Sequence, residues 1–213
     1  VWGTLAPVAN DVLRVADDVP VRRISTLLEP QGRAEGNPVR LAENSGIAYI
    51  GCYVLGMGFV LEAAEAQEWI AADPRNAEVL FPYLNGEDLN SRPDASASRW
   101  VIDFGAVAEK EAASYELPFT RVAERVRPER MKNNRKVYCD YWWQYAEKRP
   151  AMRKAIADLS EVLVIALVSK TVMPIRVPST QVFSHMLGVF ASDDFGVQAV
   201  LSSSLHQLWA ITY

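Results

Sequence analysis

The sequence contains few of the side chains on which metal and nucleophilic chemistry depends. Among its 213 residues there are only two histidines and two cysteines. His185, His206, Cys52 and Cys139 lack the close spacing that zinc ligands show in a sequence. We therefore expect no metal site, and we interpret both cysteines as reduced structural thiols of a cytoplasmic protein.

Other signatures of catalysis and of membrane insertion are missing as well. The longest aliphatic run, residues 162–168, is seven residues long, whereas a bilayer-spanning helix needs roughly 20. The glycines form no GxGxxG or Walker pattern for phosphate, and no GxSxG nucleophile motif occurs. The adjacent acids at 87–88 and 193–194 are typical of turns or caps. We find no catalytic constellation and predict that this chain is not itself an enzyme.

The composition is that of a folded protein. Hydrophobic residues make up 50% of the chain and charged residues 23%, which is typical of a globular domain. Strands and helices are expected without a regular βαβ order. We therefore predict an α+β fold, an irregular mixed α/β arrangement in which a small mixed β-sheet is flanked by helices. The expected strands are 47–55, 57–61, 100–104, 158–168, 172–176 and 181–190, and the expected helices are 62–72, 106–113, 118–126, 133–145 and 195–211.

The first part of the chain differs in texture from the rest. Residues 1–40 are mixed and rich in turn signals, whereas a compact pattern begins near residue 41. We predict that residues 1–40 are an N-terminal arm or linker from an upstream domain, and that residues 41–213 form one domain. Because the sequence starts with Val1 and not Met, we expect it to be part of a longer protein.

The positive charge is concentrated in one part of the chain. Residues 121–154 carry eleven Lys and Arg against four Asp and Glu, a local net charge of +7 within an overall net charge of −4. The remaining residues therefore carry a net charge of −11. Such asymmetry is typical of a face that binds a polyanion. The alternative is a solvated helix face whose charges form salt bridges, and the charge count alone does not separate the two.

The densest basic segment also carries amides and is followed by aromatic residues. Lys and Arg can neutralise phosphates, whereas Asn and Arg can form paired hydrogen bonds with base edges. Trp142 and Trp143 can either stack on bases or support the fold, and at least one of them must face the core. The candidate nucleic-acid-binding residues of this segment are Arg127, Arg130, Lys132, Asn133, Asn134, Arg135 and Lys136.

An ordered set of short motifs resembles a known protein family. Together they resemble the target-recognition domain of the MmeI-like bacterial DNA methyltransferases, which are single-chain type II restriction–modification enzymes. The resemblance covers roughly residues 40–213. The motifs lie at residues 79–89 (VLFPYLNGEDL), 92–93, 99–104 (RWVIDF), 126–130, 142–143, 149–150, 168–170, 195–197, 201–203 and 205–209 (LHQLW).

The resemblance implies a division of labour along a longer chain. Members of the family carry a nuclease region, then an S-adenosylmethionine-dependent adenine-N6 methyltransferase domain, and then this domain. The methyltransferase hallmark, an Asn-Pro-Pro-aromatic sequence, does not occur here, and neither does a D-ExK nuclease pattern. The resemblance therefore implies that catalysis, S-adenosylmethionine and any Mg²⁺ for cleavage belong upstream. The implied partners of this chain are double-stranded DNA and the upstream methyltransferase domain.

The resemblance also points to a second group of DNA-binding residues. It implies that Ser169 and Lys170 contact phosphates or base edges, and that residues 180–185 supply base-reading groups. These groups belong to Thr180, Gln181, Ser184 and His185. Strand alternation places Gln181, Phe183 and His185 on one face and Val182 and Ser184 on the other. The candidate residues of this strand therefore cannot all read bases. A half-buried structural histidine is the alternative for His185. A further reading loop of the family lies beyond Tyr213.

Two other functions remain open at this stage. One is a protein-interaction or scaffold domain whose basic face meets an acidic partner. The other is a stand-alone enzyme acting on a small anionic substrate, which the missing catalytic constellation disfavours. The DNA hypothesis requires the cationic stretch and the polar strand near residue 180 to form a single surface shaped to a double helix.

The charge clustering leads to a prediction about variants. We expect Arg130→Ala and Arg135→Ala to weaken binding to all duplexes alike, because phosphate contacts carry no sequence information. Gln181→Ala and His185→Ala should instead change the preference among sites, by about 1–3 kcal/mol for each lost paired contact. Binding isotherms on several duplexes measure both effects, and equal losses on all sequences would remove Gln181 from the reading residues.

Overall fold

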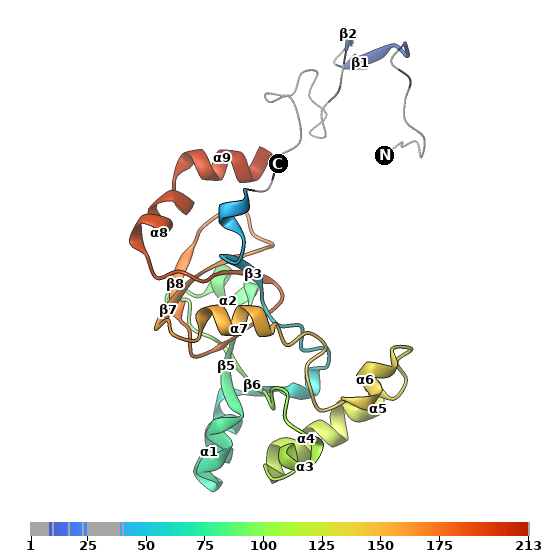
Figure 1. Cartoon of the computed structure of the whole chain (residues 1–213), viewed down its shortest axis with the longest axis vertical. Coiled ribbons are helices and arrows are strands. Elements are labelled where there is room, and N and C mark those ends of the chain that lie inside the picture. The colour runs from blue at the N-terminus through green and yellow to red at the C-terminus, as the bar shows by residue number, and fades with distance from the viewer. Residues whose placement is uncertain are drawn as a thin grey trace. The chain divides into compact units, whose positions relative to one another are not determined.

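The computed structural model describes residues 9, 11–16, 18–22, 24, 39 and 41–212. The chain divides into one unit of Leu41–Gln207 and a second unit of Val1–Arg40 with Leu208–Tyr213. In the second unit, β1 (Arg14–Ala16) pairs antiparallel with β2 (Val19–Val21), as Figure 1 shows. Most of the predicted arm lies outside the described residues, and its assignment stays a prediction.

One four-stranded sheet of the larger unit is antiparallel throughout. Its order is β3 (Ala48–Ile50), β10 (Leu187–Phe190), β7 (Glu161–Ala166) and β8 (Ile175–Pro178). The aliphatic run of the sequence forms β7, where Val162, Leu163 and Val164 are completely buried. A continuous apolar strand needs cover on both faces. Helix α2 (Gly86–Ser91) packs against β7 and supplies part of this cover.

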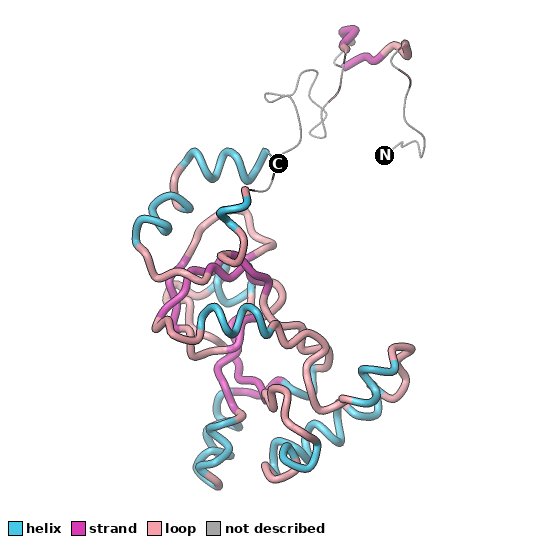
Figure 2. The backbone as a smooth tube through the Cα atoms, in the orientation of Figure 1, coloured by secondary structure: helices cyan, strands magenta, loops and turns pink. Residues whose placement is uncertain are grey.

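The second four-stranded sheet is mixed. Its order is β4 (Val60–Glu62), β6 (Arg99–Ile102), β5 (Leu80–Leu84) and β9 (Val182–Phe183). The pairs β4–β6 and β5–β6 are antiparallel, whereas β5 and β9 run parallel. Figure 2 shows the strands of both sheets in magenta. Because β9 and β10 are separated by only three residues but belong to different sheets, this short connection joins the two sheets.

The segment at residues 51–53 completes the junction between the sheets. The Cys52 amide donates to Phe183 O at 2.7 Å, and the His185 amide donates to Cys52 O at 2.9 Å. On the other side of β9, the Ser184 amide donates to Leu84 O at 2.9 Å. Gly51 makes this approach possible, because a Cβ there would lie 2.2 Å from the Ser184 carbonyl oxygen. Three segments that are distant in the sequence are thus joined side by side by main-chain hydrogen bonds.

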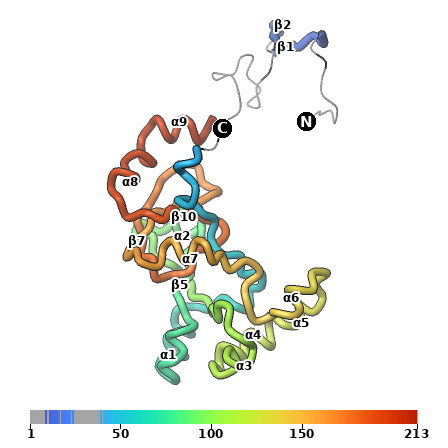
Figure 3. The backbone as a smooth tube through the Cα atoms, viewed as in Figure 1, coloured from blue at the N-terminus to red at the C-terminus, as the bar shows by residue number. Residues whose placement is uncertain are grey.

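The helices are short and lie around the sheets, as the coloured tube in Figure 3 shows. In α4 (Glu116–Arg125) the predicted pattern is confirmed, since Val122 and the following Val126 are completely buried. The remaining helices are α1 (Ala63–Ala72), α3 (Glu109–Ala112), α5 (Arg127–Arg130), α6 (Lys136–Asp140), α7 (Pro150–Ile156), α8 (Phe195–Leu201) and α9 (Ser204–Thr212). Short 3₁₀ helices form at Ala42–Asn44, Met57–Phe59 and Pro74–Glu78.

The mixed α+β fold is confirmed, but several predicted elements differ in extent. The expected helix at 133–145 contains only α6, and the expected strand at 181–190 is interrupted by a turn at residues 185–186. The expected last helix breaks at residues 202–203 into α8 and α9. Val200 of α8 and Leu205 of α9 are 66% and 79% exposed. Among the described residues, no helix is both long and apolar enough to cross a bilayer.

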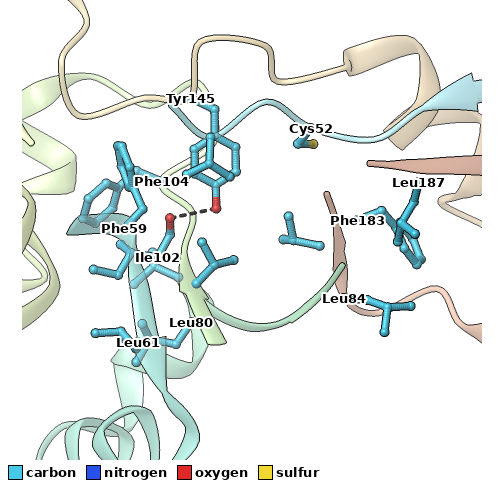
Figure 4. Close-up of a cluster of buried hydrophobic side chains, with 14 of the residues drawn as sticks. Cys52, Phe59, Leu61, Leu80, Leu84, Ile102, Phe104, Tyr145, Phe183 and Leu187 are labelled. Carbon is cyan, nitrogen blue, oxygen red and sulfur yellow. Dashed lines mark hydrogen bonds between the residues drawn. The ribbon is translucent and has the colours of Figure 1, made fainter. Parts of the chain in front are cut away.

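A single apolar cluster extends across both sheets. Figure 4 shows Phe59, Leu61, Leu80 and Ile102 at one end and Phe183 and Leu187 at the other. Tyr145 lies in this cluster, and its hydroxyl donates to Ile102 O at 2.8 Å. Burial raises the pKa of this hydroxyl well above its ordinary value. Tyr145 is therefore a neutral core residue and not an acid or base.

The junction leads to a stability prediction. We expect Gly51→Ala to lower the free energy of unfolding by about 3 kcal/mol, because a methyl group would force apart two hydrogen-bonded segments. The matched control is Gly86→Ala, where a Cβ meets nothing closer than 3.6 Å, so its stability should change by less than about 1 kcal/mol. Urea unfolding measures both, and equal stability of the two variants would contradict the close approach.

Candidate nucleic-acid interface

Most of the predicted basic segment is exposed. We define the cationic arm as residues 127–136, which comprise α5 and the turn that leads into α6. Its exposed polar residues are the acid Glu129 together with Arg127, Lys132, Asn133, Asn134, Arg135 and Lys136. Lys136 pairs with Asp140 at 2.6 Å across one helical turn, whereas Lys132 has no ion pair with a described residue. The arm therefore presents several cations and two amides to solvent.

Aromatic rings support the cations of the arm. The Arg127 guanidinium lies 5.2 Å from the ring centre of Trp142, and the Arg135 guanidinium lies 5.6 Å from that of Tyr138. Arg135 also donates to the Tyr138 hydroxyl at 3.0 Å. Such contacts hold a guanidinium at the surface and leave its other donors available.

Arg130 is the exception, and its assignment as a phosphate contact is contradicted. Its side chain is only 2% exposed, so it cannot reach a ligand at the surface. It donates to the carbonyl oxygens of Val54 and Leu55 at 2.9 and 3.0 Å, and to that of Gln144 at 3.2 Å. Burial lowers the pKa of this guanidinium from its ordinary value. Arg130 thus binds main-chain carbonyl oxygens inside the domain, and its guanidinium is not available to phosphates at the surface.

The two tryptophans after the arm belong to the core. Trp142 and Trp143 are 3% and 6% exposed. The Trp143 indole donates to Val107 O at 3.0 Å, and the ring of Trp142 packs against Phe119. Of the two roles that the sequence left open, the structural one therefore holds for both residues, and stacking of either ring on a base is excluded in this conformation.

The second predicted group is partly exposed. Ser169 and Lys170 are exposed in the loop after β7, and Thr180 is exposed just before β9. Ser184 is contradicted as a reader, because it is only 3% exposed and its hydroxyl accepts from the Met186 amide. Its main chain belongs to the junction, where its amide donates to Leu84 O.

Gln181 and His185 do not share one exposed strand face. Residues 182–184 between them are buried on both sides, and His185 lies in the turn that follows the strand. Gln181 lines a pocket of about 320 Å³ beside Thr180 and Arg153, and its amide donates to Pro178 O at 2.9 Å. His185 lines a different and larger pocket. The predicted alternation fails because β9 is an interior strand and not a surface strand.

The larger pocket has a volume of about 700 Å³, and we call it the central pocket. Residues 53–57 form one wall, the end of β5 with α2 forms another, and Arg99, Val168, His185 and Met186 complete the lining. Residues 54 and 55 of the first wall are those whose carbonyl oxygens accept hydrogen bonds from Arg130. Val168 of the far wall directly precedes Ser169 and Lys170. The central pocket therefore lies between the two predicted segments.

The two predicted segments themselves do not lie side by side. Figure 1 shows α5 and α6 projecting from one side of the larger unit, with β7 and β8 on the other side. The single continuous surface that the sequence hypothesis required is therefore not formed by these two segments alone. The central pocket and its rim supply the part of the surface between them.

Some polar groups of the central pocket have hydrogen-bond partners within the domain, and others have none among the described residues. The Arg99 side chain is exposed and makes no hydrogen bond or ion pair with a described residue. His185 Nδ1 is buried without a hydrogen-bond partner among the described residues. Burial raises the pKa of the Tyr83 hydroxyl, although its hydrogen bond with Ser184 opposes the increase. Arg99 thus brings an unpaired donor to the lining of a pocket that is large enough for a ligand, whereas the unpaired His185 Nδ1 is enclosed.

Sequence reasoning missed most of the residues of this pocket. Tyr53, the α2 residue Asn90 with the N-cap Asn85, and Arg99 come from three separate segments, and none of them lies in a basic or aromatic run. The sequence predicts a turn or a helix cap at the adjacent acids 87–88. This interpretation is correct, because Asn85 caps α2 by accepting from the Glu87 and Asp88 amides. The pocket becomes visible only when the segments are brought together.

The described residues contain no group of three or more His, Cys, Asp or Glu side chains placed to hold a metal ion. Cys52 is buried, and burial raises the pKa of its thiol. This thiol is therefore protonated near neutral pH and is not an activated nucleophile.

The different positions of the arginines lead to a prediction about stability. Arg130→Ala should lower the free energy of unfolding by about 3–5 kcal/mol, because three carbonyl oxygens lose a buried, charged donor. Arg135→Ala, on the same arm but exposed, should change it by less than about 0.5 kcal/mol. Thermal or urea unfolding checks both values, and similar losses for the two variants would show that Arg130 is not buried in solution.

Comparisons with known proteins agree with the fold but do not identify the chain. No protein-family model matches the sequence, and no curated protein matches it. Among solved structures, the chain is similar to the type IIL restriction–modification enzyme MmeI, which was solved in complex with DNA. The similarity has a TM-score of 0.66 at 16% sequence identity and covers 90% of this chain. The chain spans about a quarter (25%) of the length of MmeI. This chain and a part of MmeI thus share a related fold.

Proposed function

We propose that this chain is a sequence-specific recognition domain for double-stranded DNA and part of a larger restriction–modification enzyme. The observation that carries the proposal is the likeness to MmeI over 90% of the chain, because MmeI was solved with DNA bound. A fold alone does not determine a function. The proposal therefore also needs a surface on this chain whose chemistry suits DNA.

The cationic arm is such a surface. Its exposed Lys132 and Arg135 stand beside two amides, Asn133 and Asn134, within a segment of positive local charge. Cations that form no internal ion pairs can displace the counterions of DNA, which supplies affinity without sequence information. On the other side of the central pocket, the exposed Lys170 adds a further cation. A duplex that covers the pocket would contact both segments along its backbone.

The proposal assigns no reaction to this chain. The parent enzyme that we propose transfers a methyl group from S-adenosylmethionine to the N6 atom of an adenine, and its catalytic domain would precede this chain. A base must leave the stack before it is methylated. A separate domain that holds the duplex and reads the neighbouring bases is therefore useful to such an enzyme. Any Mg²⁺ needed for cleavage would also bind in the upstream part.

Salt-titrated binding tests the proposal directly. We expect the logarithm of the affinity for a duplex to fall linearly with the logarithm of the salt concentration. Arg135→Ala should make this slope shallower by about 1, because one phosphate contact is lost. Fluorescence anisotropy with a labelled duplex measures the slope. Affinity for DNA that does not depend on salt would contradict the proposal, and saturable binding only to an acidic protein would favour the scaffold alternative.

Base reading requires a separate measurement. Selection from duplexes with a randomised segment should yield a preferred sequence, and Gln181→Ala or His185→Ala should relax the preference at individual positions. The expected loss is about 1–3 kcal/mol for each paired contact. Lys132→Ala is the control, since it should weaken binding to all sequences alike. A preference that survives both changes would remove these two residues from the reading surface.

A further inference from the structure

We propose that the central pocket receives one unstacked nucleobase of the bound DNA, an inference that rests on the proposed function. The pocket is about 700 Å³ in volume, which is within the range of roughly 300–1,000 Å³ typical of small-ligand sites. Proteins that bind a base outside the helix hold it between aromatic or apolar side chains and contact its edge by hydrogen bonds. The central pocket offers both kinds of group.

The walls of the pocket suit the face of a flat heterocycle. Tyr53 and His185 are in edge-to-face contact, with ring centres 4.6 Å apart. Tyr53 is 37% exposed and Met57 is 69% exposed, so both present apolar surface that nothing in the described structure covers. A base stacked against Tyr53 would bury this surface. Stacking on an aromatic side chain tolerates any base, because every base has a π face.

Hydrogen-bonding groups lie around these walls. His185 lines the pocket, and its Nδ1 atom is buried without a partner among the described residues, which is a costly arrangement for a polar atom. The Asn90 amide nitrogen already donates to Val168 O at 3.0 Å, and its carbonyl oxygen accepts no hydrogen bond from a described residue. The Arg99 guanidinium is unpaired among the described residues, and a guanidinium can bind a phosphate or a guanine edge.

The pocket is also preorganised, which lowers the entropic cost of binding. Leu55 has a φ of 51°, in the left-handed region that a leucine rarely adopts. Arg130 donates to the carbonyl oxygens of Val54 and Leu55 and thereby holds this strained wall in place. The segment that contains His185, on another side of the pocket, is fixed by the main-chain hydrogen bonds of the junction. Strain that is held in place at the wall of a cavity is typical of a binding site.

Duplexes that carry a single extrahelical position test the inference without knowledge of the recognised sequence. Three sets of otherwise identical duplexes are compared by anisotropy: fully paired, with one extrahelical base of each of the four kinds, and with an extrahelical abasic site. The abasic duplex has the same flexibility but lacks a base. We expect at least one extrahelical base to bind about 10-fold tighter than the abasic duplex, which is the effect of one stacked base.

Two tyrosine variants show where that base binds. In Tyr53→Ala the preference for the base over the abasic site should disappear. Tyr141→Ala is the matched control, since Tyr141 is 51% exposed but does not line the pocket, and it should keep the preference. Circular dichroism confirms that both variants are folded.

The possible outcomes separate this inference from the proposed function. If the paired duplex binds with the expected salt dependence but no base binds tighter than the abasic site, the pocket inference fails and the proposed function stands. If Tyr53→Ala retains the preference, the base binds elsewhere and the inference also fails. If no duplex binds at all, both proposals are overturned.

Discussion

The architecture depends on one set of main-chain hydrogen bonds, those that join residues 51–53 and the end of β5 to residues 183–187. They connect the two four-stranded sheets, and the lining residues 53–57, 83–91 and 185–186 of the central pocket lie in or next to these three segments. The constraint is steric as much as electrostatic, because the segments approach each other so closely at Gly51 that no side chain fits between them. The geometry of the proposed interface is therefore a consequence of how the sheets are joined.

Burial decides what each positive charge of the domain does. Arg130 and Arg135 are five residues apart in the same basic segment, and the local sequence does not tell them apart. Arg130 is nevertheless enclosed by carbonyl oxygens, whereas Arg135 lies at the surface. An internal arginine without a carboxylate partner must be compensated by dipoles, since burying a charge is costly. Arg130 meets this condition by fixing residues 54 and 55. Arg130, which the sequence analysis assigned to DNA binding, thus contributes to the shape of the central pocket.

The division of roles among the polar residues follows from the same principle. Exposed residues of the cationic arm suit the backbone of a duplex, which any sequence presents in the same way. Residues that could distinguish bases lie where the surface is hollowed, at His185 and the rim of the central pocket and at Gln181 beside the smaller pocket. The smaller pocket is lined by the buried strand β9 itself, and His185 of the central pocket follows the end of this strand. A single interior strand therefore positions both candidate reading sites, one at each of its ends.

The sequence by itself determined the mixed α+β class, the buried β7 strand, the apolar face of α4 and the presence of a cationic segment, because each depends on residues that are close together in the chain. It did not determine the short length of α6, the interior position of β9 and Ser184, or the burial of Arg130. Only the tertiary structure decided these, together with the pocket formed by Tyr53, Asn90, Arg99 and His185. The physical reason is that side-chain exposure is set by contacts between distant segments, and local patterns of hydrophobicity and charge do not contain those contacts.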